Sequence, residues 1–296
     1  MELNTLLQYK PYSTARTEKR ALYAGLLTGL TQFHREHCPE YGRLLDALGC
    51  PAHMDCTVES TPMLPVSLFK ELELRSIPEG EVFKTITSSG TTGQRVSRIF
   101  LDGATSACQQ QALCQIMSDF LGERRLPFLV LDSRQVLRNR AMFSARGAGI
   151  LGFSIFGTRP CYALDEHMEL DLDGVRAFLE EHQGETIFLF GFTFIIWKHV
   201  VRALEERGER LDIPNGILVH GGGWKKLAGE AVSPGEFKAR VAAATGVERV
   251  SNYYGMAEQT GCIYMECPQG HLHASLWSDI VVRRGRDYRP CEPGEE

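Results

Sequence analysis

Thr85-Ile86-Thr87-Ser88-Ser89-Gly90-Thr91-Thr92-Gly93-Gln94-Arg95 is the stretch around which the rest of this chain is organised. From Thr87 to Gly93, five of the seven residues carry a hydroxyl group and the other two are glycines. Such a segment buries little apolar surface. It offers unshielded backbone N–H groups beside short hydroxyl donors, which are the groups that bind phosphate oxygens. Taken alone, the segment is equally typical of a polar turn between two strands. The rest of the sequence is needed to distinguish a phosphate-binding loop from such a turn.

The composition is that of a globular protein with a sizeable core. The chain has 296 residues, of which 43% are hydrophobic and 23% are charged. This length suits one large domain or two closely joined lobes. The net charge of −5 gives no basic excess that would favour nucleic acid or an anionic membrane surface. No apolar run approaches the roughly 20 residues of a membrane span.

The cysteines and the N-terminus predict a cytoplasmic protein. Nine cysteines, an odd number at irregular spacing, suit a reducing compartment better than a disulfide framework. The start, Met1-Glu2-Leu3-Asn4, lacks the basic and then apolar pattern of a secretory signal.

Hydrophobic periodicity predicts helices and strands that alternate along the chain. Strands are predicted over residues 83–87, 99–101, 128–132, 187–190 and 217–219. Helices are predicted over residues 17–37, 104–121 and 194–207, and a further helix from the capping box at Ser233 to Gly246. This alternation predicts an α/β fold with a largely parallel sheet flanked by helices.

Two further stretches have residues suited to a ligand. His220-Gly221-Gly222-Gly223-Trp224-Lys225 follows a predicted strand, and its glycines let a flat ring lie against bare backbone. The stretch from Ser251 to Gln259 supplies the Tyr254 ring and, four residues later, a carboxylate suited to magnesium. Ligands of parallel sheets bind beyond the carboxyl ends of the strands, so these stretches are expected to meet there. The alternative for each is an ordinary surface turn.

The order and spacing of the three stretches resemble the adenylate-forming superfamily of acyl and aryl ligases. A P-loop NTPase is disfavoured, because no Gly-Lys-Ser/Thr ends the glycine-rich loop. Longer blocks narrow the resemblance to the acyl-protein synthetase (LuxE) family, and they span essentially the whole chain. The blocks are Leu64–Lys70, Val82–Lys84, Ser88–Gln94, Ser97–Asp102, Arg125–Pro127, Phe190–Phe194 and His220–Lys225.

The resemblance implies the N-terminal domain of an adenylate-forming enzyme over residues 1–296. Within it, residues 1–82 would be a helical and extended region, and residues 83–296 the nucleotide- and acyl-binding core. The family activates a fatty acid with ATP and Mg²⁺ to an acyl-adenylate and then passes the acyl group to a cysteine thiol. The implied partners are a fatty or other carboxylic acid and an acyl-accepting protein thiol, on an acyl reductase or a carrier protein. The alternatives are an acyl- or aryl-CoA ligase of the same superfamily and a nucleotide-binding module without catalysis.

The resemblance also implies roles for individual residues. The loop of Ser88, Ser89, Gly90, Thr91, Thr92 and Gly93 would hold the β- and γ-phosphates. Gly221, Gly222 and Gly223 would lie near the adenine and the acyl group. Tyr254, which Gly255 follows, would pack on the adenine, and Glu258 would bind Mg²⁺. Lys225 is a candidate for offsetting developing charge, with simple solvation as the alternative.

Three departures from the family pattern bear on activity. Ala257 stands where many members have a threonine or serine, and the nearest cations after the glycine-rich loop are Arg95 and Arg98 rather than a lysine. The sequence ends at Pro293-Gly294-Glu295-Glu296, where family members continue, so a C-terminal part is expected to be missing. ATP binding is therefore expected to survive better than turnover.

Two smaller groups of residues complete the candidates. Cys262, Cys267, His271 and His273 are soft metal ligands close together in the sequence. They are candidates for a zinc site, although their spacing matches no standard finger. Phe188, Phe190, Phe192, Phe194 and Trp197 are candidates for the wall of an acyl channel. Core packing is the expected role for most of this aromatic run, with Phe192 and Thr193 the better pocket candidates.

Overall fold

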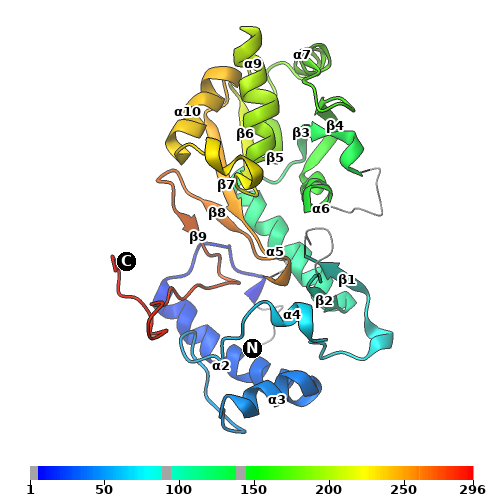
Figure 1. Ribbon diagram of the computed structural model, residues 1–296. Helices are drawn as coiled ribbons and strands as arrows, with labels where there is room; N and C mark the ends of the chain where they lie inside the picture. The colour runs from blue at the N-terminus through cyan, green and yellow to red at the C-terminus, as the bar shows by residue number, and fades with distance from the viewer. Residues whose placement is uncertain (1–5, 89–94, 138–144, 260, 296) are drawn as a thin grey trace. The chain divides into compact units, whose positions relative to one another are not determined.

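The computed structural model describes residues 6–88, 95–137, 145–259 and 261–295 (Figure 1). The chain forms two compact units. Unit 1 comprises Met1–Asp119, Gly255–Ile263 and Ala274–Glu296, and unit 2 comprises Phe120–Tyr254 and Tyr264–His273. Among the described helices, none is both long and apolar enough to cross a membrane.

Unit 2 contains a sheet whose described strands follow the order β4-β3-β5-β6-β7-β8-β9. The strands are β3 (Leu126–Ser133), β4 (Gly157–Leu164), β5 (Ile187–Phe192), β6 (Gly216–Gly221), β7 (Arg249–Tyr254), β8 (Tyr264–Glu266) and β9 (Leu272–His273). The strands from β4 to β7 are parallel, and β8 and β9 join antiparallel at one edge. The predicted α/β fold with a largely parallel sheet is confirmed.

The helices of unit 2 connect these strands and cover the sheet (Figure 1). They are α6 (Ala145–Phe153), α7 (Leu172–Glu181), α8 (Thr193–Ile195), the π-helical turn η5 (Ile196–Val201), α9 (Arg202–Arg207) and α10 (Pro234–Thr245). The short 3₁₀ turns are η2 (Arg134–Leu137), η4 (Ser154–Phe156) and η6 (Lys225–Glu230). Because α8, η5 and α9 follow one another without a break, they confirm the helix predicted over residues 194–207.

The predicted ends of α10 are confirmed by its caps. The Ser233 hydroxyl accepts a hydrogen bond from the N–H of Glu236 at 3.2 Å, and Pro234 occupies the first turn. Gly246 ends the helix with a left-handed φ of 74°. Both caps follow the pattern from which the helix was predicted.

Aromatic rings fill the core on the α6 side of the sheet. Phe188 of β5 stacks on Phe128 of β3 with ring centroids 4.9 Å apart, and Phe190 stacks on Phe153 of α6 at 4.3 Å. Phe188, Phe190 and Trp197 are each at most 3% exposed. The expected core role of the aromatic run is therefore confirmed for these residues.

Unit 1 consists mainly of helices and one hairpin. Its elements are α2 (Arg16–His37), α3 (Pro39–Ala47), α4 (Leu68–Glu71), η1 (Glu79–Glu81), β1 (Lys84–Thr87), β2 (Arg98–Leu101) and η7 (Ala257–Gln259). Helix α5 (Gly103–Leu121) begins in unit 1, and its last two residues belong to unit 2. The helices predicted over residues 17–37 and 104–121 are confirmed by α2 and α5.

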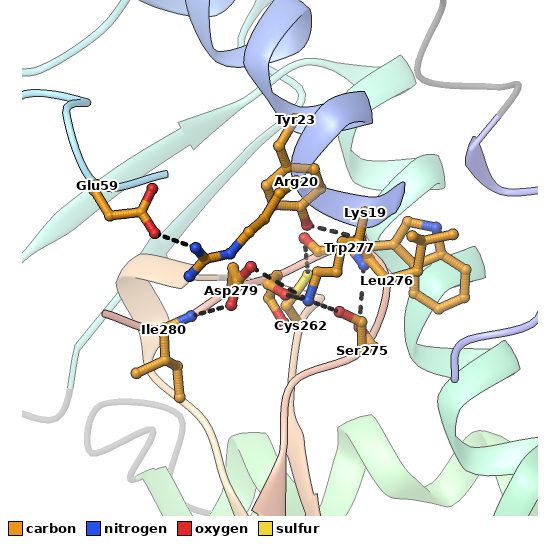
Figure 2. Close-up of polar contacts among 11 residues, drawn as sticks. Lys19, Arg20, Tyr23, Glu59, Cys262, Ser275, Leu276, Trp277, Asp279 and Ile280 are labelled. Atoms are coloured by element: carbon orange, nitrogen blue, oxygen red, sulfur yellow. Dashed lines mark hydrogen bonds and ion pairs between the residues drawn. The ribbon is translucent and has the colours of Figure 1, made fainter. Parts of the chain in front are cut away.

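The helix α2 is bound to a segment near the other end of the sequence (Figure 2). The Lys19 ammonium group donates hydrogen bonds to the carbonyl oxygens of Ser275 at 2.9 Å and Ser278 at 2.5 Å, and it lies 3.8 Å from the Asp279 carboxylate. One turn later, the Tyr23 hydroxyl donates to the carbonyl oxygen of Leu276 at 2.7 Å. Lys19 is only 8% exposed, and this burial lowers its pKa even though Asp279 acts in the opposite direction. Unit 1 is thus held together by contacts between residues far apart in the sequence.

Candidate functional site

The carboxyl ends of three parallel strands lie side by side in unit 2. Phe192, the last residue of β5, pairs in register with Gly221 of β6, and His220 pairs with Asn252 of β7. The turn of residues 221–225 therefore lies between the start of α8 and the end of β7. This is the edge of the sheet at which the sequence predicts a ligand.

Two glycines of this turn, Gly221 and Gly222, have close neighbours that leave no room for side chains. A Cβ atom added at Gly221 would lie 2.7 Å from the Tyr253 ring, and one at Gly222 would lie 2.5 Å from the Phe192 ring. Gly222 and Gly223 also have left-handed φ angles of 81° and 62°. Other L-residues rarely adopt this conformation, so glycine is required here for both space and backbone angle.

The backbone donors of the turn have no partner of their own. Within the described residues, the N–H groups of Gly222 and Gly223 make no hydrogen bond. A Cβ added at Gly223 would meet nothing within 4 Å, so the turn is open on that side. The turn therefore presents free N–H donors and bare backbone.

The residue before the glycines, His220, is buried and hydrogen-bonded. Its Nδ1 atom lies 2.9 Å from the Thr193 hydroxyl oxygen, which in turn donates to the carbonyl oxygen of Gly221 at 3.0 Å. Burial lowers the pKa of His220 to about 3, and the nearby Lys238 ammonium group acts in the same direction. The imidazole is therefore neutral at physiological pH. Thr193, expected as a pocket residue, is 6% exposed and engaged in this network instead.

Two predicted site residues of unit 2 are at the surface. The Tyr254 ring is 50% exposed and lies 6.0 Å from the ring of Tyr264. Lys225 has a left-handed φ of 47°, and its ammonium group lies 5.8 Å from the Phe192 ring centroid and 5.3 Å from that of Phe194. The structure thus places the glycine turn and Lys225 together at the end of β5, and Tyr254 at the end of β7.

The other predicted site residues belong to unit 1. Ser88 follows β1 and closes the β1–β2 hairpin, because its N–H donates to the Ser97 carbonyl at 3.2 Å and its hydroxyl accepts from the Ser97 N–H at 2.9 Å. The predicted phosphate-binding residues Ser89–Gly93 lie outside the described residues. The two strands predicted on either side of the glycine-rich loop are confirmed by β1 and β2.

Glu258 lies on the short turn η7, which contacts β2. Its carboxylate makes no ion pair or hydrogen bond with the described residues, and it is half-buried. Gly255, the first residue of this segment of unit 1, is exposed. A partly buried carboxylate without a protein partner is chemically suited to a hard cation such as Mg²⁺.

The cations nearest to the glycine-rich loop are paired with glutamates. Arg95 forms an ion pair with Glu71 of α4 at 2.7 Å. Arg98 lies 3.8 Å from the Glu73 carboxylate and 5.9 Å from the Phe100 ring centroid. Each arginine thus has an acidic partner within unit 1.

The four candidate zinc ligands are not brought together. Cys262 belongs to unit 1, its thiol donates to the Trp277 carbonyl at 3.4 Å, and burial raises its pKa to about 11. Cys267, His271 and His273 belong to unit 2, where the N–H of Cys267 donates to the His271 carbonyl at 2.9 Å. Across the described chain, no group of three or more His, Cys, Asp or Glu side chains is placed to hold a metal ion.

Two surface hollows in the described residues are lined by residues other than these candidates. One hollow lies between α2 and residues 51–55 and includes Gln32 and Arg35. Another lies at the start of α7 and includes Asp171 and Arg176. No predicted site residue lines either hollow.

Comparison with known proteins gives a family and a fold. The family model described as acyl-protein synthetase, LuxE, matches residues 2–296. The long-chain-fatty-acid–luciferin-component ligase of Vibrio harveyi is 22% identical over 233 residues, which cover 77% of this chain and 59% of that protein. The chain thus spans about three fifths of the length of this relative.

The fold resembles that of a solved CoA ligase. A 2-hydroxyisobutyryl-CoA ligase, in its postadenylation state with R3-HIB-AMP, superimposes with a TM-score of 0.60 at 16% identity, over 97% of this chain and 59% of that one. The NpsA N-terminal subdomain of Klebsiella oxytoca has a TM-score of 0.40 at 17% identity, over 86% of this chain and 62% of its own.

Proposed function

The chain belongs to the acyl-protein synthetase (LuxE) family, and we propose that it activates a carboxylic acid with ATP and passes the acyl group to a protein thiol. The family match over residues 2–296 is the observation that carries this proposal. The name of the Vibrio harveyi relative supports a long-chain fatty acid as the substrate class. The acceptor would be a cysteine thiol of a reductase or carrier protein. We also assign nucleotide and acyl binding to residues 83–296.

The residues at the strand ends of unit 2 fit a nucleotide. Tyr254 is half-exposed, which suits its ring to stacking on adenine, and the bare backbone of Gly221–Gly223 lets a flat group approach closely. We assign the triphosphate to Ser88–Gly93, whose hydroxyl and glycine content is suited to phosphate oxygens. Bound ATP would supply the adenylyl group and the pyrophosphate leaving group.

Adenylation of a carboxylic acid requires little proton transfer by the protein. The carboxylate is already ionised at neutral pH, so the protein must mainly orient it and offset charge as the bond to phosphorus forms. Lys225 and the free N–H groups of the glycine turn are suited to that role. The neutral, buried His220 does not act as a base on the substrate in this scheme.

We assign Mg²⁺ binding to Glu258, because its carboxylate has no partner among the described residues. The variant Glu258→Gln keeps the shape and removes the charge. Acid-dependent exchange of labelled pyrophosphate into ATP is expected to fall about tenfold or more, because a charge-assisted metal contact is lost. The matched control is Glu248→Gln at an exposed residue of unit 2, which is expected to leave exchange unchanged. Equal activity of the two variants would refute the assignment.

The exchange assay on the wild-type protein tests the proposed reaction itself. Labelled pyrophosphate should enter ATP only when Mg²⁺ and a carboxylic acid are present, and a panel of short- to long-chain acids should reveal a preference. Titration calorimetry with ATP·Mg²⁺ measures binding separately. ATP binding without exchange for any acid would contradict the ligase and favour a nucleotide-binding module.

The second half of the reaction distinguishes a protein acceptor from coenzyme A. Transfer of labelled acyl groups to protein without added CoA supports the acyl-protein synthetase, whereas product formation that requires CoA supports a CoA ligase. We place the protein in the cytoplasm, and its nine free cysteines support a reducing compartment.

A further inference from the structure

The hydroxyl group of Thr193 is a single donor placed between two acceptors. Its oxygen lies 3.0 Å from the Gly221 carbonyl oxygen and 2.9 Å from Nδ1 of His220. A neutral imidazole has one protonated and one unprotonated nitrogen, and the surroundings select which nitrogen carries the proton. If Nδ1 were unprotonated, it would compete with the Gly221 carbonyl for the one hydroxyl proton. If Nδ1 carries the proton, both contacts are satisfied at once.

We propose that Thr193 and His220 are positioning residues for the proposed adenylation reaction, acting through the glycine turn. His220 donates from Nδ1 to the Thr193 oxygen, which commits the hydroxyl proton to the Gly221 carbonyl. This inference rests on the proposed function, since the turn is the part of the site that would face the acyl-adenylate. Neither side chain touches the substrate in this arrangement.

The planarity of the peptide bond links this network to the ligand side of the turn. In a trans peptide the C=O and the following N–H point in opposite directions. Because the Gly221 carbonyl is held toward Thr193, the N–H of Gly222 must point away from Thr193. That N–H is one of the free donors of the turn. Fixing the carbonyl therefore fixes the direction of a donor offered to the substrate.

Neighbouring side chains enclose the hydrogen-bonded residues His220 and Thr193 and the turn beside them. The Phe192 ring lies where a Cβ of Gly222 would be, and His220 packs against Phe237 of α10 with ring centroids 4.6 Å apart. The charged group that faces His220 is Lys238 of α10, whose ammonium group is bound by the buried Glu266 carboxylate at 3.0 Å. The histidine is thus enclosed by an aromatic ring and a paired cation, which keeps it neutral.

Variants of Thr193 test the proposal by activity. Thr193→Val removes the hydroxyl with little change of shape, and kcat/KM for acid-dependent pyrophosphate exchange is expected to fall about tenfold, the usual effect of one lost hydrogen bond. Thr193→Ser restores the hydroxyl and is expected to stay within about threefold of wild type. If Thr193→Val and Thr193→Ser lower kcat/KM for exchange by the same factor, the proposal is overturned.

The matched control for stability is Thr245→Val in the same unit. Thr245 is 4% exposed, and its hydroxyl also donates to a backbone carbonyl, that of Val241, at 2.7 Å. Both valine variants should lower stability alike, but only Thr193→Val should lower the rate of exchange. If Thr245→Val loses as much exchange activity as Thr193→Val, the role of Thr193 is structural and the proposal fails.

The protonation state of His220 gives a test without activity. In ¹⁵N-labelled protein, with the His220 signals assigned by comparison with His220→Asn, Nδ1 should resonate as a protonated nitrogen and Nε2 as an unprotonated one. The reverse pattern would overturn the proposal. If wild-type protein shows no exchange with any acid, the proposed function fails, whereas the nitrogen spectrum still decides the arrangement of Thr193 and His220.

Discussion

At the scale of single residues, the buried ammonium group of Lys19 has a measurable structural role. Lys19→Met removes the donor to two carbonyl oxygens and the cation paired with the Asp279 carboxylate. The free energy of unfolding is expected to fall by about 2–4 kcal/mol, because buried groups that lose a charged partner are costly. Denaturant unfolding followed by circular dichroism measures this change.

The matched control for Lys19 is the same substitution at an exposed lysine. Lys10→Met is expected to change the free energy of unfolding by less than about 0.5 kcal/mol. Similar values for the two variants would mean that the carbonyl contacts of Lys19 do not stabilise unit 1.

The buried His220 makes stability depend on pH. Its pKa is lowered from 6.5 to about 3 in the folded protein, first by burial and then by Lys238. As the pH falls from 6.5 toward 3, the unfolded chain binds a proton at this residue and the folded chain does not. The stability contributed by the neutral histidine is therefore fully present above pH 6.5 and is lost as the solution becomes more acidic.

Urea unfolding at two pH values checks this prediction. Between pH of about 7.5 and about 5.5, wild-type protein is expected to lose on the order of 1 kcal/mol more stability than His220→Asn, since the variant cannot bind that proton. Equal losses in the two proteins would show that His220 titrates normally in the folded state.

At the scale of elements, two glycines of α6 should respond in opposite ways to alanine. A Cβ at Gly149 would lie 2.9 Å from the Phe192 ring, whereas one at Gly152 would meet nothing within 4 Å. Gly149→Ala is expected to lower the free energy of unfolding by about 1–2 kcal/mol, because the helix must shift from a close-packed ring. Gly152→Ala is expected to raise it by about 0.5–1 kcal/mol, because alanine favours the helix.

Thermal and denaturant unfolding of the two α6 variants measure these changes in the free energy of unfolding. The pair shares a helix and a substitution, so helix propensity affects both alike. A stabilising effect of Gly149→Ala would mean that α6 does not pack closely on β5.

The long periodic elements were predictable from sequence, and the less regular ones were not. The apolar run of β5 and the capping residues of α10 indicated those elements directly. Strand β4 begins with Gly157-Thr158-Arg159-Pro160, which is typical of a turn. Because β4 lies at the edge of the sheet, Pro160 is tolerated in this strand.

The same limit applies to the candidate site. The sequence identified the glycine turn because its residues follow a buried strand and carry no side chain. The link between Thr193 and His220 joins residues 27 positions apart, and only the register of β5 against β6 places them together. The position of Thr193 directly after a buried strand indicated a residue at the strand end, but it did not indicate His220 as its partner.

At the scale of the whole molecule, amide exchange should reveal where stability is concentrated. The described residues of β5 and β6 are all buried, whereas three of the four residues of β1 are exposed. Hydrogen exchange measured by mass spectrometry is expected to be slowest in β5 and β6 and much faster in β1, because buried central strands open only with the global unfolding of their unit. Faster exchange in β5 than in β1 would contradict this distribution.

The contacts of Lys19 also bear on how the chain is made. Lys19 and Ser275 are 256 residues apart in the sequence. At a synthesis rate of about 5–20 residues per second, the ammonium group waits on the order of tens of seconds for its carbonyl partners to leave the ribosome. Residues 120–254 are complete before then, so unit 2 is expected to resist proteolysis on arrested nascent chains while α2 is still cleaved. Helix α2, although it is synthesised early, would then be among the last parts of the chain to reach its native contacts.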